Sequence, residues 1–401
     1  MIICSLGYDY QYLFNKTHEQ ISTNKTIALV ANSTWNIYNF RLNLIDKFLA
    51  EGMDVVVIAP VDEYLTYKEK YPTVRHFSLR TMDRDSTNPI KYFLLVLELT
   101  RRYKKIKPDI VLHFTNKPNI FGGVAARLAG VKSIAVVTGL GYAFIHNGFI
   151  KKVISWLYRV TAGFHQKFIF ENIEDRKLFA SLKIVEGSRA VSVKGCGVDT
   201  AWFHPYPNGL SRDKTIFTFI GRLLYDKGIR EFVEAAKIIK STMSNVDFWI
   251  VGELDPENPA TVDKDDLIKW VEEDIVYYHG FIKDVRDIIA KSDCIVLPSY
   301  REAIPRTITE AMSMSKPVIT TDTAGCREAV DQDKNGFLVK VKDAASLTES
   351  FIQFLELKHD DREAMGKAGR EKAIREFDDK LIAIDIFKIV KKLFHGKIGQ
   401  F

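Results

Sequence analysis

Two glutamates near the end of the chain, Glu302 and Glu310, flank a segment that reads as the entry to a helix. The segment 299–312, SYREAIPRTITEAM, follows an apolar run. Pro305 suits the first helical position, where its missing N–H is no loss. The free amides of that turn, roughly residues 304–307, can then face an anion such as a diphosphate.

The two carboxylates suit different hydroxyl groups of one ligand. Glu310 falls about one and a half turns into the predicted helix, where a carboxylate can accept both hydroxyls of a ribose. Glu302 lies in the preceding loop and can accept from a bound sugar. The alternative is a pair of solvated glutamates beside a surface helix, but the position after an apolar strand and loop favours a ligand site. The segment therefore suits a nucleotide-linked sugar.

A second loop, Gly221-Arg222-Leu223-Leu224-Tyr225-Asp226-Lys227-Gly228, supplies positive charge. Gly221 permits a tight turn, Arg222 can fork onto phosphate oxygens, and Lys227 adds a compact charge before the next helix. Together with a helix N-terminus, two cations can neutralise a departing diphosphate without a metal. On its own, the loop is equally consistent with ordinary surface cations.

Two further strand ends border the same region. Gly252 follows the strand that contains Trp249, and Phe281 follows the next predicted strand. Gly252 indicates a close backbone approach, and Phe281 can border a nucleobase. A plain core role for Phe281 is equally supported.

Three loops of the first half also follow predicted strands. We expect them to line a cleft that they share with the loops described above. Gly139 and Gly141 let backbone amides approach an anion. No histidine is singled out as a base. The candidate cleft residues are Ser33, Asn116, Lys117, Thr138, Gly139, Gly141 and Tyr142.

The composition is that of a globular protein with two or three domains. The 401 residues are 46% hydrophobic and 27% charged. No run approaches the ~18 consecutive apolar residues of a membrane span. The first residues lack the basic and apolar regions of a signal peptide, and four cysteines without metal-ligand spacing predict reduced thiols in a cytoplasmic protein. We expect no metal and no other cofactor.

The net charge of +6 is unevenly distributed. Residues 1–200 carry 27 Lys+Arg against 17 Asp+Glu, a balance of +10, whereas the remainder carries 30 against 34, a balance of −4. A basic half suggests an anionic partner. Nucleic acid is poorly supported, because no zinc-finger spacing or RNA-binding aromatic motif is present. The aromatic, basic segment 149–159 fits either a helix on an anionic membrane face or a core helix with exposed lysines.

Apolar runs alternate with helical patterns, which predicts parallel sheets with helices on both faces. A first series has strands near 26–31, 54–59, 74–78, 110–114 and 133–138, with helices near 38–49, 89–106 and 119–130. A second has strands near 216–220, 247–251, 275–278, 294–297 and 317–320. We expect an arm (1–24), two similar α/β domains (25–205 and 206–376) and a last helix (377–401) that crosses back. Ligands in such sheets bind at the carboxyl ends of the strands, so the cleft between the domains is the predicted site.

Together these residues resemble the family 4 glycosyltransferases of the GT-B fold, from about residue 25 onward. The segment 302–310 and the loop 221–228 carry the resemblance most strongly. Further matches are Gly195-Cys196-Gly197-Val198-Asp199…Phe203, Thr321-Asp322…Gly325-Cys326-Arg327-Glu328 and Asn335-Gly336-Phe337-Leu338-Val339. Segments 38–41 and 138–142 resemble the bacterial subgroup that builds capsule, O-antigen and N-glycans on undecaprenyl diphosphate.

The resemblance implies two Rossmann-like, doubly wound domains that face each other across a cleft. The first would bind the acceptor and the second the nucleotide sugar. It implies transfer with retention of configuration, without a metal, from a UDP-sugar to a lipid-diphosphate-linked saccharide. The donor sugar would be a hexosamine. The protein would be cytoplasmic and peripherally associated with the inner membrane.

Site roles are carried over by position. The resemblance implies that Arg222 and Lys227 hold the diphosphate, that Glu302 holds the donor sugar and that Glu310 holds the ribose. The backbone of Ile304, Pro305 and Arg306 would meet phosphate or sugar. Two residues depart from the family pattern. Ala303 stands where a glycine is usual, which tightens the sugar pocket, and Asn116 falls near where many relatives have a histidine.

Two other functions remain open at this point. A nucleotide-sugar epimerase on the same scaffold would isomerise UDP-sugar without an acceptor. A non-catalytic scaffold protein would bind the donor without turnover, although the presence of both glutamates and both cations argues against it. A nicotinamide dehydrogenase is poorly supported, because no G-x-G-x-x-G follows the first strand.

Overall fold

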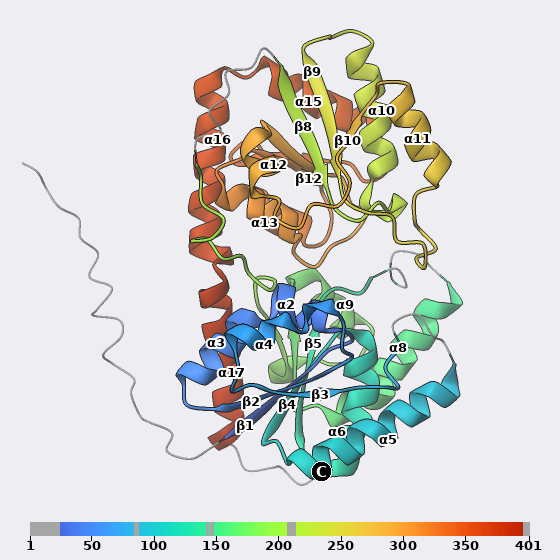
Figure 1. Cartoon of the computed structure of the whole chain (residues 1–401), viewed down its shortest axis with the longest axis vertical. Helices are drawn as coiled ribbons and strands as arrows, with labels where there is room; N and C mark the ends of the chain where they lie inside the picture. Colours follow the sequence, from blue (N-terminus) through green and yellow to red (C-terminus); the bar gives the residue numbers. More distant parts are fainter. Residues whose placement is uncertain (1–24, 84–87, 142–143, 145–147, 207–213, 396–401) are drawn as a thin grey trace, which may run out of the picture.

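The computed structural model describes residues 25–83, 88–141, 144, 148–206 and 214–395, so the predicted arm 1–24 and Tyr142 lie outside the described residues. The chain forms two α/β halves stacked along the longest axis of the molecule (Figure 1). Each half contains one sheet, and the neighbouring strands in both sheets are parallel. The predicted doubly wound α/β fold class is therefore confirmed.

The first sheet has the strand order β3-β2-β1-β4-β5-β6-β7. In β2, only the first residue is exposed and the five apolar residues after it are buried, as expected for a parallel strand covered on both faces. The strands are β1 (Thr26–Val30), β2 (Asp54–Ala59), β3 (Arg75–Ser78), β4 (Ile110–Phe114), β5 (Lys132–Val137), β6 (Lys167–Phe170) and β7 (Ala190–Ser192). The α-helices are α2 (Thr34–Phe40), α3 (Leu42–Ala50), α4 (Tyr67–Lys70), α5 (Pro89–Ile106), α6 (Gly123–Ala129), α8 (Phe149–Thr161) and α9 (Ile173–Ser181). The short helices are η1 (Glu63–Thr66), η2 (Pro118–Gly122), η3 (Ala162–Phe164) and η4 (Gly187–Arg189).

The second sheet repeats this arrangement in the order β10-β9-β8-β11-β12-β13. Its strands are β8 (Thr215–Ile220), β9 (Val246–Val251), β10 (Tyr277–Tyr278), β11 (Cys294–Leu297), β12 (Val318–Thr321) and β13 (Gly336–Val339). Its helices are η5 (Tyr225–Lys227), α10 (Ile229–Lys240), α11 (Lys264–Glu272), α12 (Arg286–Lys291), α13 (Arg306–Ser313), α14 (Cys326–Ala329), α15 (Ala344–Glu356) and α16 (His359–Lys372). Within the described residues, no helix is long and apolar enough to cross a membrane.

Two segments of the chain connect the halves, and the two segments run next to each other. η6 (Ala373–Phe377) leads into α17 (Asp379–His395), which packs against α3 and buries Ile386 and Val390 in the core of the first half. Figure 1 shows α17 running beside the first half. The other segment passes Gly197, whose φ is +84° and where a Cβ would lie 2.4 Å from the Cα of Asp379. Only glycine lets the two connections approach this closely.

The structure corrects the secondary-structure prediction at several points. The single helix predicted over 38–49 is two helices, α2 and α3, which meet at Arg41. The Arg41 side chain is 2% exposed, because its guanidinium pairs with Glu171 at 2.9 Å and lies 4.4 Å from the Phe114 ring centroid. The strands β6, β7 and β13 were not predicted: β7 has only three residues, β13 begins with Gly336, which strands disfavour, and the short apolar run of β6 was not recognised.

Candidate active site

The predicted donor residues follow neighbouring strands of the second sheet. The loop with Arg222 and Lys227 follows β8, and the loop with Glu302 follows β11. β8 lies between β9 and β11, so the strand order reverses here. A doubly wound sheet binds ligands beside such a reversal, at the carboxyl ends of its strands. In the first sheet, the loops with Ser33 and Asn116 follow β1 and β4, which flank the corresponding reversal.

Lys227 and Glu302 form an ion pair between these two loops. The side chains are 22% and 14% exposed, so the pair is mostly shielded from solvent. Gly228 permits this approach: its φ is +75°, and a Cβ there would lie 2.0 Å from the carbonyl oxygen of Pro298. The structure thus brings together two residues that the sequence assigned separately to phosphate and sugar.

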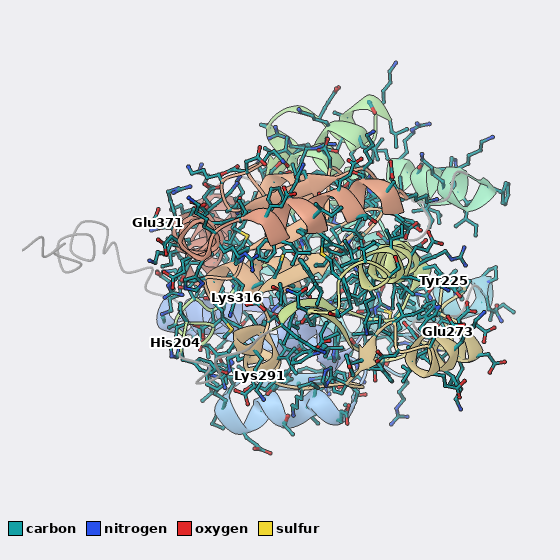
Figure 2. All side chains as sticks on the ribbon, turned by 90° about the horizontal axis from the view of Figure 1, so that it is seen from above. His204, Tyr225, Glu273, Lys291, Lys316 and Glu371 are labelled. Carbon is teal, nitrogen blue, oxygen red and sulfur yellow. The ribbon has the colours of Figure 1, made fainter. Side chains whose placement is uncertain are left out.

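The loop that carries Lys227 is anchored on its other side. The Tyr225 hydroxyl donates a hydrogen bond of 2.6 Å to Asp266 on α11. Figure 2 looks along the long axis and shows Tyr225 on the same side of the molecule as Glu273, the residue that follows α11. This hydrogen bond ties the loop to α11 two residues before Lys227.

Arg222 points to a different carboxylate. Its guanidinium pairs with Asp255 at 2.7 Å, and its side chain is 43% exposed. Among the described residues, no hydrogen bond or ion pair joins Arg222 to the Lys227–Glu302 pair. Arg222 is therefore held beside this edge of the sheet with half of its surface open to solvent.

Three neighbouring strands, β8, β9 and β10, are followed by Gly221, Gly252 and Phe281. Gly252 has a φ of +150°, and a Cβ there would lie 1.8 Å from the carbonyl oxygen of Gly221, so a side chain cannot be accommodated. Its amide donates to the Gly280 carbonyl at 2.9 Å. Phe281 is 56% exposed, which excludes the alternative that it is a core residue.

Helix α13 begins one residue later than predicted. Pro305 is the N-cap, with φ −70° and ψ 116°, and the first helical residue is Arg306. An extended Pro305 turns the chain into the helix and leaves the amides beside it pointing out of the helix end. Among the described residues, the amides of Ile304, Arg306 and Thr307 make no hydrogen bond within the protein. These donors are the ones an anion needs.

Glu310 lies in the second turn of α13 and is 9% exposed. Arg306 donates to it through Nε at 2.7 Å. Burial raises the pKa of the Glu310 carboxyl, and the charge of Arg306 partly offsets this. Glu310 is thus a shielded hydrogen-bond acceptor on the helix that starts at the free amides.

The loop between Glu302 and α13 is packed by glycines from both halves. Gly325 has a φ of +76°, and a Cβ there would lie 1.7 Å from the carbonyl oxygen of Ala303. A Cβ at Gly139, in the first half, would lie 3.3 Å from the Cβ of Ala303, and one at Gly195 would lie 2.8 Å from the Cβ of Ile304. The Gly139 loop and the Glu302 loop therefore meet across the two halves, as a site between domains requires.

The other first-half candidates are engaged locally. Ser33 caps α2 by accepting from the Asn36 amide at 3.1 Å. Asn116 accepts a hydrogen bond of 2.8 Å from the Tyr158 hydroxyl, and Lys117 donates to the Asp83 carbonyl at 2.7 Å. Thr138 is partly buried and Gly141 is exposed. Tyr142 lies outside the described residues.

The buried histidines of the first half belong to its core. His113 and His165 both share a hydrogen bond with the Ser133 hydroxyl, at 3.0 and 2.7 Å. They are 0% and 2% exposed. Burial lowers the pKa of His165 to about 4, so it is neutral at physiological pH. Within the described residues, no cluster of three or more His, Cys, Asp or Glu side chains could hold a metal ion.

Comparison with known proteins decides the family. The "Glycosyl transferase 4-like" profile matches residues 26–172, and the "Glycosyl transferases group 1" profile matches residues 202–372. An N,N'-diacetylbacillosaminyl-diphospho-undecaprenol alpha-1,3-N-acetylgalactosaminyltransferase of Campylobacter jejuni is 30% identical over 350 residues, which are 82% of this chain and 89% of the relative. The chain belongs to the family 4 glycosyltransferases. A UDP-Gal:alpha-D-GlcNAc-diphosphoundecaprenol alpha-1,3-galactosyltransferase of Escherichia coli is also 30% identical, over 83% of this chain and 88% of the relative.

Solved structures agree with the glycosyltransferase fold. Sucrose-phosphate synthase from Thermosynechococcus elongatus has a TM-score of 0.75 at 19% identity and covers 92% of this chain and 99% of its own. HepE from Anabaena, in complex with UDP and glucose, has a TM-score of 0.73 at 17% identity and covers 91% and 99%. At these identities the likeness concerns the fold alone, and it confirms the predicted GT-B arrangement.

Sequence reasoning missed the contacts that join the two halves of this glycosyltransferase. Lys283 of the second half lies 6.0 Å from the Tyr38 ring centroid and 5.9 Å from that of Tyr64, both in the first half. Arg301 forms an ion pair with Asp175 of α9. Only Tyr38 gave a signal, as part of the 38–41 match, because separate short patterns do not reveal which residues meet across a cleft.

Proposed function

We propose that this glycosyltransferase moves a hexosamine, with retention of configuration, from a UDP-sugar to a lipid-diphosphate-linked saccharide in surface polysaccharide or glycan biosynthesis. The observation that carries the proposal is the Lys227–Glu302 pair beside the free amides that begin α13. Both relatives named above carry diphospho-undecaprenol acceptors in their names, which supports the acceptor class. The Campylobacter name specifies N-acetylgalactosamine and the Escherichia name galactose, so the amino sugar rests on the first of them.

The donor would lie along the carboxyl edge of the second sheet. Glu310 would accept the ribose hydroxyls, and the Ile304 and Arg306 amides would meet the diphosphate or the sugar. Lys227 and Arg222 would supply positive charge to the diphosphate, each by exchanging part of its present carboxylate contact for phosphate oxygens. The exposed ring of Phe281 and the backbone at Gly252 would border the uracil.

The chemistry needs little from the first half. The bond between the anomeric carbon and the diphosphate oxygen breaks while the acceptor hydroxyl oxygen bonds to the same carbon on the same face. The hydroxyl proton passes to the leaving phosphate oxygen, so a separate base is not required. This agrees with the neutral, buried state of His165. The fixed cations stabilise the charge that develops on the leaving group.

The lipid part of the acceptor would be met at α8. This helix exposes a stripe of large apolar side chains beside basic ones, which suits the surface of an anionic membrane. Phe149 is 80% exposed and Trp156 58%. A surface cavity of about 670 Å³ lies against the helix and is lined in part by Lys151, Lys152 and Arg159. None of the residues that line this cavity is among those proposed to bind the donor, which fits a headgroup contact rather than a role in the transfer step.

The test is a screen of UDP-sugars against short polyprenyl-diphosphate saccharides, read by mass spectrometry. We expect one donor to extend one acceptor by a single sugar, without added metal. Donor incubated alone is the control: a new UDP-sugar would instead identify an epimerase. UDP-sugar binding without turnover across the acceptor panel would support a scaffold protein and contradict the proposal.

A further inference from the structure

The first turn of α9 reaches across to the second half at three points. The Asp175 carboxylate pairs with the Arg301 guanidinium, and Glu174 pairs with Arg327 at 2.6 Å. The backbone amide of Ile173 donates to the Glu328 carboxylate at 2.8 Å. Figure 1 shows α9 at the end of the first half that faces the second. One helical turn of the first half therefore holds the loop that carries Glu302 and the short helix α14 of the second.

The Glu302 loop and the residues that lead into α14 are packed together. The Glu302 amide donates to the carbonyl of Ala324 at 3.3 Å. Gly325 lies against the carbonyl oxygen of Ala303, where no larger residue fits. Arg301 immediately precedes Glu302 in sequence. A shift of Arg301 therefore also shifts Glu302, the residue proposed to hold the donor sugar.

Of the two ion pairs, the one at Arg301 is shielded from water. The Asp175 side chain is 0% exposed and that of Arg301 is 21% exposed. Asn172 also donates to Asp175, at 3.0 Å. Burial raises the pKa of the Asp175 carboxyl, and the charge of Arg301 is the main opposing influence. A buried carboxylate with this partner specifies one position for the arginine, because any displacement leaves a charge without compensation.

We propose that Asp175 is a positioning residue for the transfer reaction, which fixes Arg301 and, through it, Glu302 against the first half. The proposal rests on the proposed function, since it assigns Glu302 to the donor sugar. Asp175 itself does not touch the reacting atoms. Its loss would let the Glu302 loop move away from the first half and from the Gly139 loop, without removing any group proposed to bind the nucleotide.

The neighbouring ion pair provides a matched control. Glu174 lies in the same helical turn and also pairs with an arginine of the second half. Its side chain is 33% exposed and that of Arg327 is 44% exposed, and solvent-exposed pairs contribute little. Glu174→Gln and Asp175→Asn therefore make the same chemical change, one residue apart, at an exposed and a buried pair.

The experiment measures kcat, the KM for donor and the Kd for UDP in the full-length protein. Asp175→Asn is expected to lower kcat on the order of 10–100-fold, because a displaced Glu302 misplaces the donor sugar, and to change the UDP Kd by less than about threefold. Glu174→Gln is expected to change kcat by less than about threefold. Arg301→Gln and the double variant should match Asp175→Asn, because the two residues act as one unit.

A second readout does not depend on activity. Small-angle scattering of unliganded Asp175→Asn should give a larger radius of gyration than wild type, with Glu174→Gln unchanged. Asp175→Asn with wild-type kcat, or with reduced kcat but an unchanged radius, would overturn the proposal. If Asp175→Asn does not fold, Arg301→Gln makes the same test from the other half. Absence of transfer by the wild type would reject the proposed function, whereas the scattering result would still decide whether this pair holds the halves together.

Discussion

Replacing Lys227 with methionine removes one positive charge from the proposed diphosphate site while retaining a side chain of similar length. The Lys227–Glu302 side chains are 22% and 14% exposed, which places the pair between an exposed one, worth about 0–1 kcal/mol, and a buried one, whose disruption costs about 3–5 kcal/mol. We therefore expect Lys227→Met to lower the free energy of unfolding by about 1–3 kcal/mol.

The effect on the reaction should be larger than the effect on stability. Loss of one fixed group that faces developing charge lowers kcat on the order of 10²–10³-fold, or about 2.7–4 kcal/mol. The two effects separate in the double variant with Glu302→Gln. That change removes the uncompensated carboxylate and should restore much of the stability, but it cannot restore the positive charge needed for transfer.

The assay follows transfer from the UDP-sugar identified in the screen, together with urea unfolding of the same preparations. Lys214→Met is the matched control. Lys214 pairs with Asp247 at 2.9 Å but directly precedes β8, at the amino ends of the strands. It should leave kcat unchanged. Lys227 does not have this role if Lys227→Met retains kcat within threefold of wild type, or if the Lys214 and Lys227 variants lose activity equally.

Three further outcomes are expected. Arg222→Ala should lower kcat on the order of 10²–10³-fold, measured by the same transfer assay, and near-normal turnover would remove its proposed role. Burial and two neighbouring carboxylates raise the pKa of Asp379 to about 6, so the folded protein binds more protons than the unfolded chain between about pH 4 and 6 and loses this stabilisation as the pH rises. Asp379→Asn should therefore match wild type in urea unfolding near pH 4 and exceed it by about 1–2 kcal/mol above pH 6, and an equal difference at both pH values would contradict this. Reversing the charges of Lys152 and Arg159 should weaken co-sedimentation with anionic vesicles at least about tenfold, at about 1 kcal/mol per basic residue removed; unchanged sedimentation would make α8 merely structural.

Much of the fold could be predicted because its strands are short, nearly uninterrupted apolar runs. β2 and β8 are buried almost throughout, and their sequences carry the pattern of strands covered on both faces. The loops that follow such strands must meet at one edge of the sheet, so the approximate place of the donor residues could also be predicted. The break at Arg41 could not, because it depends on a partner, Glu171, that lies 130 positions away.

Which charged residues of the site pair with each other could not be predicted either. Lys227 and Glu302 are 75 positions apart, and Asp175 and Arg301 are 126 apart. Local patterns identify a cation or a carboxylate after a strand, but they contain no information about which of them meet. The contact between Gly139 and Ala303 could not be predicted for the same reason, since the local sequence around each residue does not identify its partner.

The most direct test of the central claim is a crystal structure of the protein with UDP or a UDP-sugar bound. We expect ribose hydroxyls within hydrogen-bond distance of Glu310, with the diphosphate between the start of α13 and the side chains of Arg222 and Lys227. UDP bound away from the carboxyl edge of the second sheet, or a diphosphate held by a metal ion in place of these two cations, would contradict it.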